Sequence, residues 1–181
     1  MQYESFAGLV FGLAMFVTSA VAAYINPNIL TIEGQQRDIL AQYSIARLRS
    51  DFQNLVIETR TPWTKEGETV RFRGPRISEV LRRHGMDSAE SVNFVAYDNF
   101  TSEILLKEIE TYQPIFAIYR ACMSDDVRSG KCKSGQDFTP LSPQEQGPIF
   151  LVWPYEQLPA AYVPARNSIW VWFVVAVRPA E

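Results

Sequence analysis

The chain has 181 residues, with 17 basic and 20 acidic side chains and a formal net charge of −3 at pH 7. This length fits a single domain. A nearly neutral charge without a basic stripe argues against nucleic acid as a partner. The only histidine, His84, lies near the end of an expected helix, so the sequence offers no basis for a histidine-centred catalytic triad.

An almost wholly apolar run opens the chain, from Phe6 to Ala23, and ends in small residues just before Tyr24. We interpret residues 1–23 as a signal peptide that is cleaved after Ala22 or Ala23. A retained membrane anchor, with the domain outside, is the alternative. The residues before the run carry Glu4 and no lysine or arginine, which departs from the usual positive start of a signal peptide.

Two cysteines, Cys122 and Cys132, flank the polar segment MSDDVRSGK. In an oxidising compartment this pair predicts a disulfide that closes a short loop. Two free thiols would be expected instead in the cytosol. A metal site lacks further cysteine or histidine ligands, and the spacing is far from Cys-x-x-Cys. The expected location is therefore outside the cytoplasm, in the periplasm, or at the membrane if the leader is retained.

Alternating apolar and polar residues predict a strand over 29–34 and a hairpin partner over 38–44. A short helix follows, with Ser44 as its N-cap and Leu48 facing inward. One longer helix from Glu33 to Asp51 is the alternative.

The remaining elements follow the same patterns. The segment Ser91–Leu106 is expected to form two strands that are joined near Asp98-Asn99, where the turn residues suit a hairpin. The expected strands are 54–59, 67–74, two within 91–106, 114–121, 148–155 and 168–178, with one helix over 77–85 and a short helix or turn over 107–113. Many short strands with few helices predict an α+β, mostly β fold in a single domain over residues 24–181.

The loop after the 54–59 strand holds a dense group of hydrogen-bonding side chains around one aromatic ring. Arg60, together with Thr59 and Thr61, is suited to gripping a phosphate or another anion. Trp63 is suited to stacking on a flat ring. A loop at the end of an apolar strand is a common place for a ligand, although an ordinary surface turn is the alternative.

Other candidate ligand-binding residues lie at the ends of further expected strands. They are Tyr97 and Asp98 at one strand end, Arg120 at another and Tyr155 at a third. If these strand ends converge on the loop, they form a pocket of aromatic rings and two arginines that suits an anionic or planar ligand.

Structural roles compete with binding for several of these residues. Arg120 has acids at 125–126 close by in sequence, so an ion pair is the expectation for it. The acids themselves are expected to be solvated. For Trp153, Trp170 and Trp172 we expect packing in the core or at an interface.

The segments resemble, in the same order, those of the small sulfite-oxidase-like proteins, the oxidoreductase molybdopterin-binding domains. The similarity spans Asn28 to Arg178. The segments that carry it are ILTIEG, YSIARL, TRTPWT, FRG followed by ISEVLRRHG, FVAYDNFTSEI, PIFAIYR and GPIFLVWPY. The resemblance implies a sulfite-oxidase-type molybdopterin-binding fold, an α+β barrel-like sandwich that cradles a molybdenum cofactor in the larger enzymes.

One departure from the family bears on function. The catalytic relatives hold molybdenum through a cysteine in the loop equivalent to Thr59–Thr64, and this loop has none. Threonine is a poor replacement, because soft metal centres are held by thiolates. The resemblance therefore implies an exported, non-catalytic domain without a cofactor. Such a domain would recognise a small anionic or planar ligand, or a partner protein at the membrane or in the periplasm. An oxidoreductase subunit that still binds molybdopterin is the alternative.

Overall fold

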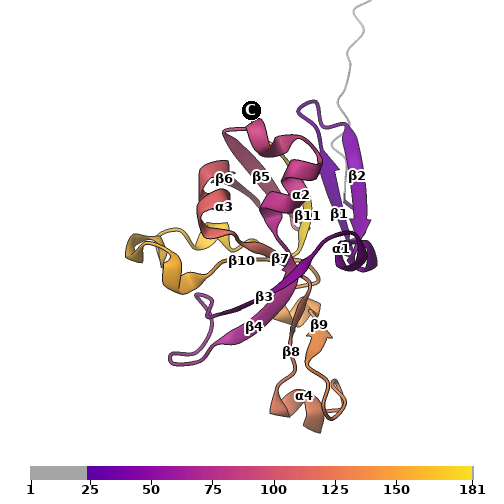
Figure 1. Cartoon of the computed structure of the whole chain (residues 1–181), viewed down its shortest axis with the longest axis vertical. Helices are drawn as coiled ribbons and strands as arrows, with labels where there is room; N and C mark the ends of the chain where they lie inside the picture. Colours follow the sequence, from indigo (N-terminus) through magenta and orange to yellow (C-terminus); the bar gives the residue numbers. More distant parts are fainter. Residues whose placement is uncertain (1–23, 181) are drawn as a thin grey trace, which may run out of the picture.

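In the computed structural model, residues 24–180 are described, and their strands form three sheets (Figure 1). This part of the chain is a mostly β, α+β single domain, as predicted. The predicted leader, 1–23, lies outside the described residues. The strands are β1 (Ile29–Glu33), β2 (Ile39–Ser44), β3 (Asn54–Thr59), β4 (Val70–Pro75), β5 (Ser91–Ala96), β6 (Thr101–Leu105), β7 (Ile115–Ala117), β8 (Tyr119–Ala121), β9 (Phe138–Pro140), β10 (Phe150–Val152) and β11 (Val174–Pro179). The α-helices are α1 (Ile45–Asp51), α2 (Ile77–Arg83), α3 (Leu106–Tyr112) and α4 (Ser124–Arg128). The 3-10 turns are η1 (Met86–Ser88), η2 (Pro143–Glu145), η3 (Tyr155–Gln157), η4 (Ala160–Tyr162) and η5 (Asn167–Ile169).

The five-stranded sheet has the order β2-β1-β11-β5-β6. The last strand of the chain, β11, lies at its centre and pairs in parallel with β1 and antiparallel with β5. Val174 to Val177 of β11 are all buried, so this strand is covered on both faces. A run of small and β-branched apolar residues is the composition expected of such a central strand.

The first hairpin forms as predicted, with β2 antiparallel to β1. Helix α1 follows directly, and the Ser44 hydroxyl accepts a hydrogen bond from the Arg47 N–H at 3.3 Å. Leu48 of this helix faces the core and is fully buried. The alternative of one helix from Glu33 to Asp51 is wrong, because residues 39–44 are extended and pair with β1 along its whole length.

The four-stranded sheet, β3-β4-β8-β9, is antiparallel throughout, and β3 is one of its edges. Figure 1 shows β3 and β4 as a long ribbon, with α4 beyond the far ends of β8 and β9. A Cβ on Gly74 of β4 would lie 1.8 Å from the Phe116 carbonyl oxygen. Only glycine allows β4 to approach β7 this closely.

The β10-β7 pair joins the two larger sheets. Phe150 of β10 contacts Phe72 of β4, with ring centroids 5.9 Å apart, and Phe116 of β7 contacts Phe94 of β5 at 6.0 Å. Both contacts are edge-to-face, the arrangement that aromatic rings favour. One continuous core therefore extends through all three sheets.

Three expectations about element boundaries are wrong. The buried strand expected over 114–121 is divided at Ile118, where the chain leaves the β10-β7 pair and joins the four-stranded sheet. The last strand starts at Val174 rather than at residue 168, because Phe173 has a positive φ of 51° that interrupts the extended backbone. The segment between the cysteines is not only a loop, since it contains α4.

The disulfide between Cys122 and Cys132 is present, as predicted. It encloses α4, and the Cys132 N–H also donates to the Asp126 carbonyl oxygen at 3.0 Å. A disulfide indicates an oxidising compartment. Within residues 24–180, no helix is both long and apolar enough to cross a membrane.

Candidate functional site

The loop after β3 is fastened to the η3 turn by Arg60. Its guanidinium carbon lies 4.1 Å from the centre of the Tyr155 ring, and its Nε lies 3.2 Å from a carboxylate oxygen of Glu156. The Tyr155 N–H donates to the hydroxyl of Thr59 at 2.9 Å. Two of the predicted strand ends therefore do meet. A carboxylate and an aromatic face therefore already contact the guanidinium, although its Nε makes no hydrogen bond and the side chain is 42% exposed.

The threonines of this loop hold its shape. The Thr59 hydroxyl, which is buried, donates to the Arg60 carbonyl oxygen at 3.0 Å. The hydroxyl of Thr64 accepts from the Thr61 N–H at 2.8 Å, and the Thr61 hydroxyl accepts from the Trp63 N–H at 3.3 Å. Side-chain bonds of this kind are typical of turns built by threonine. The hydroxyls are thus engaged within the loop.

Trp63 extends from the loop to a second cluster of aromatic rings. Its side chain remains 46% exposed, and its ring meets that of Trp172 edge to face, with centroids 4.6 Å apart. Between them opens a cavity of about 270 Å³, which we call the aromatic pocket. It is lined by Trp63, Ala96, Asp98, Phe100, Asn167, Ser168, Trp170, Trp172 and Phe173.

Three buried polar atoms in the walls of the aromatic pocket have no hydrogen-bond partner among the described residues. They are the indole Nε1 atoms of Trp170 and Trp172 and the side-chain oxygen of Asn167. Trp170 is only 2% exposed, so water reaches its indole poorly. A buried polar group without a partner costs about 1–3 kcal/mol, and such groups are rare enough to require an explanation.

Backbone strain lies at the same place. Phe173 has a φ of 51°, a conformation that side-chain-bearing residues adopt infrequently. Two hydrogen bonds fix it there: its N–H donates to the Gln146 carbonyl at 3.2 Å, and its carbonyl accepts from the Tyr97 N–H at 2.9 Å. Strained residues held by their surroundings are concentrated at functional sites.

Asp98 and Tyr97 occupy the turn between β5 and β6. A carboxylate oxygen of Asp98 accepts the Phe100 N–H at 3.0 Å, which fixes the turn at the mouth of the aromatic pocket. The side chain of Tyr97 is 45% exposed and does not line the cavity. Trp63 and Asp98, two of the predicted site residues, therefore share one cavity.

Arg120 is placed elsewhere. It is buried, and its guanidinium donates to both carboxylate oxygens of Asp126, at 2.6 and 2.7 Å, and pairs with Glu145. The ion pair expected for it is confirmed, whereas the expected solvation of Asp126 is wrong, since this acid is buried. Arg120 contributes to neither the aromatic pocket nor the Arg60 contact.

Of the tryptophans expected in the core or at an interface, one lies in the core and two also line the aromatic pocket. Trp153 is fully buried and donates its indole N–H to the Ile169 carbonyl at 2.9 Å, as expected for a core residue. Trp170 and Trp172 pack against the core but also line the aromatic pocket, which the sequence did not indicate. Phe173 was missed as well, because nothing in its sequence context predicts its positive φ.

His84 lies at the end of α2, where its position near the helix terminus was expected. Its Nε2 atom is 2.9 Å from the Tyr43 hydroxyl. Burial is the main cause that lowers its pKa below the ordinary value, with the charge of Arg83 adding to the effect. It does not line the aromatic pocket.

No family model matches the chain, and no curated protein matches it significantly. Within residues 24–180, no group of three or more His, Cys, Asp or Glu side chains is placed to hold a metal ion.

Proposed function

We propose that this protein is an exported, non-catalytic binding domain of the sulfite-oxidase type, and that it holds a small planar ligand in the aromatic pocket. The observation that carries the proposal is a cavity walled by five aromatic rings beside three unpartnered buried polar atoms. At about 270 Å³ the cavity is close to the lower limit of ligand sites, about 300 Å³. A ligand of one or two fused rings matches this size.

The polar groups define which planar ligand fits. The indole N–H groups of Trp170 and Trp172 are donors, while Asn167 and Asp98 offer acceptor oxygens. A heterocycle that carries both carbonyl acceptors and ring N–H donors complements this set. Because the indole nitrogens are covered, the rings must shift on binding to bring them into contact with the ligand.

The charges favour a neutral or weakly basic ligand over an anion. Among the described residues, Asp98 is the only ionisable side chain that lines the aromatic pocket, and it is acidic. Arg60, the residue expected to attract an anion, is engaged by Tyr155 and Glu156. Of the two ligand classes expected from the sequence, the planar one therefore has the stronger support.

The residues present do not fit a molybdenum centre held by a thiolate. The chain has two cysteines, and both are joined in the disulfide. The aromatic pocket offers indole and phenyl rings, one amide and one carboxylate, which include no soft ligand. For this reason the proposal assigns the domain no redox step.

Titration of the intrinsic tryptophan fluorescence tests the proposal, with three probes that separate shape from charge. Pterin is planar and neutral, benzoate is planar and anionic, and sulfate is anionic but not planar. We expect pterin to bind, benzoate to bind more weakly and sulfate not to bind. Native mass spectrometry of protein purified from its exported location would show whether a natural ligand copurifies.

Matched variants connect binding to the aromatic pocket. Trp172→Ala removes the ring and should abolish pterin binding, whereas Trp172→Phe keeps a ring without the N–H and should only weaken it. Trp153→Phe is the control, since this indole is satisfied in the core. Unchanged binding in Trp172→Ala would refute the site. Stoichiometric molybdenum in the purified protein would instead restore the alternative of an oxidoreductase subunit.

A further inference from the structure

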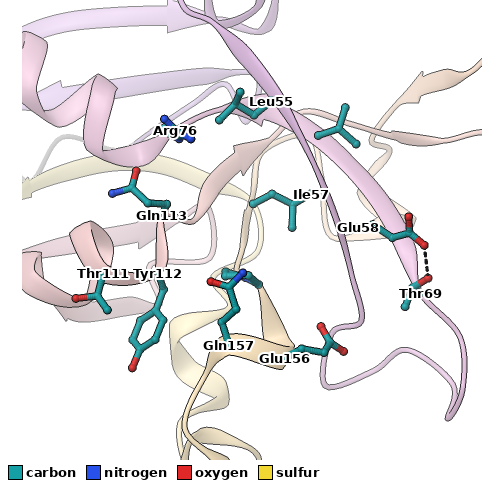
Figure 2. Close-up of a pocket in the computed structure, with 12 residues that line it drawn as sticks. Leu55, Ile57, Glu58, Thr69, Arg76, Thr111, Tyr112, Gln113, Glu156 and Gln157 are labelled. Atoms are coloured by element: carbon teal, nitrogen blue, oxygen red, sulfur yellow. Dashed lines mark hydrogen bonds between the residues drawn. The ribbon is translucent and has the colours of Figure 1, made fainter.

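A groove of about 770 Å³ runs along β3, on a part of the surface distinct from the aromatic pocket (Figure 2). Four consecutive residues of β3, from Leu55 to Glu58, contribute to its wall. Successive side chains of a strand point to opposite faces, so a wall that includes four in a row contains the edge of the strand. The other lining residues are Thr69, Arg76, Thr111, Tyr112, Gln113, Pro154, Glu156 and Gln157.

The pairing of β4 shows which backbone groups of β3 are free. The Arg73 carbonyl accepts the Ile118 N–H at 3.0 Å, so the backbone polar groups of Arg73 face β8 rather than β3. Its cross-strand neighbour Val56 therefore makes no hydrogen bond to β4. The N–H and C=O of Val56 project from the open edge, and by the same alternation so do those of Asn54 and Glu58.

The rest of β3 agrees with this assignment. Pro75, which lies opposite Asn54, has no N–H to offer to β3. Within residues 24–180, no backbone hydrogen bond joins β3 to any strand other than β4. Three N–H and three C=O groups of this six-residue strand are thus left without backbone partners at the edge.

This edge lacks the features by which proteins usually block unwanted strand pairing. Natural edge strands are protected by proline, lysine, bulges or a covering segment. The β3 sequence, NLVIET, contains neither proline nor lysine, and its register with β4 has no bulge. Val56 is 49% exposed on it. An open, apolar edge of this kind is suited to accepting another strand.

Charges mark the two ends of the groove. Figure 2 shows Arg76 at the end beside Leu55, and Glu58 and Glu156 at the opposite end, where Glu156 also pairs with Arg60. Arg76 is exposed and has no carboxylate within ion-pair distance among the described residues. A ligand with a basic group at one end and an acidic group at the other complements this arrangement.

We propose that the groove binds an extended peptide segment of a partner protein, which adds to β3 as an antiparallel strand. All other pairings in this sheet are antiparallel. In that direction the peptide's amino-terminal end lies beside Glu58 and its carboxy-terminal end beside Arg76. The matching segment is basic at its start, apolar at alternate positions opposite the half-buried Leu55 and Ile57, and acidic at its end.

A single peptide suits the space better than a second copy of this chain. The far wall of the groove consists of the end of α3, at 111–113, and the turn at 154–157, so the space beside β3 is bounded. A β3 strand from another copy would arrive with β4 on its far side. That strand would have to occupy the position of this wall.

The test uses a fluorescent probe peptide of eight residues: lysine, then alternating valine and threonine, then a terminal glutamate. We expect saturable binding by fluorescence anisotropy, with the backbone amide signals of Val56 and Glu58 shifting in NMR spectra. A peptide with the two charges exchanged should bind at least about tenfold more weakly. No saturable binding of the probe up to about 1 mM would overturn the proposal.

A matched pair of variants tests the free edge itself. Val56→Pro removes an outward N–H without removing a bond to β4, and it should abolish probe binding. Val56→Thr keeps the N–H and should bind like the wild type. Full binding by Val56→Pro would overturn the proposal. Backbone N-methylation of the probe on its β3-facing amides should abolish binding to the wild-type protein, which keeps the test valid if the proline variant folds poorly.

Self-association is the competing outcome. Analytical ultracentrifugation of the wild-type protein should give the mass of a monomer at every protein concentration measured. A dimer that Val56→Pro disrupts, together with no probe binding, would replace the peptide with a second copy of the chain and overturn the proposal.

Discussion

The indole ring of Trp63 packs edge to face against that of Trp172, with ring centroids 4.6 Å apart and planes at 72°. This contact connects the loop after β3 to the segment before β11 and forms one wall of the aromatic pocket. Edge-to-face pairs contribute about 0.5–1.5 kcal/mol beyond the area they bury.

We therefore expect a double-mutant cycle of Trp63→Ala and Trp172→Ala to give a coupling energy of about 0.5–1.5 kcal/mol. The measurement is the free energy of unfolding in urea for the wild type, both single variants and the double variant. Trp63→Phe should retain part of the coupling. Additive single effects would contradict an energetic role for the contact.

Gly74→Ala should destabilise the protein by about 3 kcal/mol or more, because the new methyl group would overlap the Phe116 carbonyl oxygen. The backbone on both sides would have to separate, which would disturb the contact between β4 and β7. Thermal and urea unfolding measure the loss.

Gly130→Ala is the matched control, because it replaces a glycine with alanine where the added methyl group meets no other atom. Gly130 has a φ of +78°, but no atom lies within 4 Å of the position that an added methyl group would take. This variant should lose only about 1 kcal/mol from strain. Equal losses in the two variants would show that the close approach at Gly74 is unimportant.

Local patterns were sufficient to predict much of this fold. The alternation in 29–34 and 38–44 indicated a hairpin, and Ser44 marked the start of α1 because its hydroxyl satisfies an N–H of the first turn. These features depend on neighbours in sequence. The division at Ile118 depends on which distant strand each half pairs with, and a continuous apolar run carries no sign of that.

The site was predicted only in part for a similar reason. Trp63 was identified as the aromatic ring of a polar loop and Asp98 as a residue at a strand end, and the two do share a cavity. For Trp170 and Trp172 packing in the core or at an interface was expected, because apolar composition does not distinguish a buried ring from one that lines a pocket. Arg120 was included for its charge and its place at a strand end, but it is bound to Asp126 and Glu145 instead.

The disulfide should stabilise the domain by about 2–3 kcal/mol, since it closes a short loop around α4. A double variant, Cys122→Ser with Cys132→Ser, is expected to lose this amount in urea unfolding, as should the reduced wild type. Thiol titration of the unreduced, denatured protein should find no reactive thiol. Two thiols per chain would show that the bridge does not form.

The two acids that pair with Arg120 should make the protein sensitive to acid. Hydrogen bonds from Arg120 lower the pKa of Asp126 to about 2 from its ordinary value of 3.8. Burial raises the pKa of Glu145, but hydrogen bonds from Lys131, Ser142 and Arg120 outweigh it and lower that pKa to about 2 from 4.5.

Because both folded-state values lie below the unfolded ones, these carboxylates stabilise the protein above about pH 4.5, and this stabilisation is lost as the pH falls towards about 2. Asp126→Asn should lower the free energy of unfolding at neutral pH by an amount on the order of 2 kcal/mol. It should also make the free energy of unfolding depend less on pH in the acid range. The measurement is urea unfolding at a series of pH values between neutrality and the acid range.

Asp125→Asn is the control, since it replaces the neighbouring acid, whose side chain is 82% exposed and pairs with Arg128 on the surface. Exposed ion pairs contribute little to stability, so this variant should keep the wild-type profile. The two neighbours differ only in which side of α4 they occupy: Asp126 faces Arg120 in the protein interior, and Asp125 faces solvent. If Asp125→Asn and Asp126→Asn had the same pH profile, the buried Arg120 pair could not be the source of the acid sensitivity.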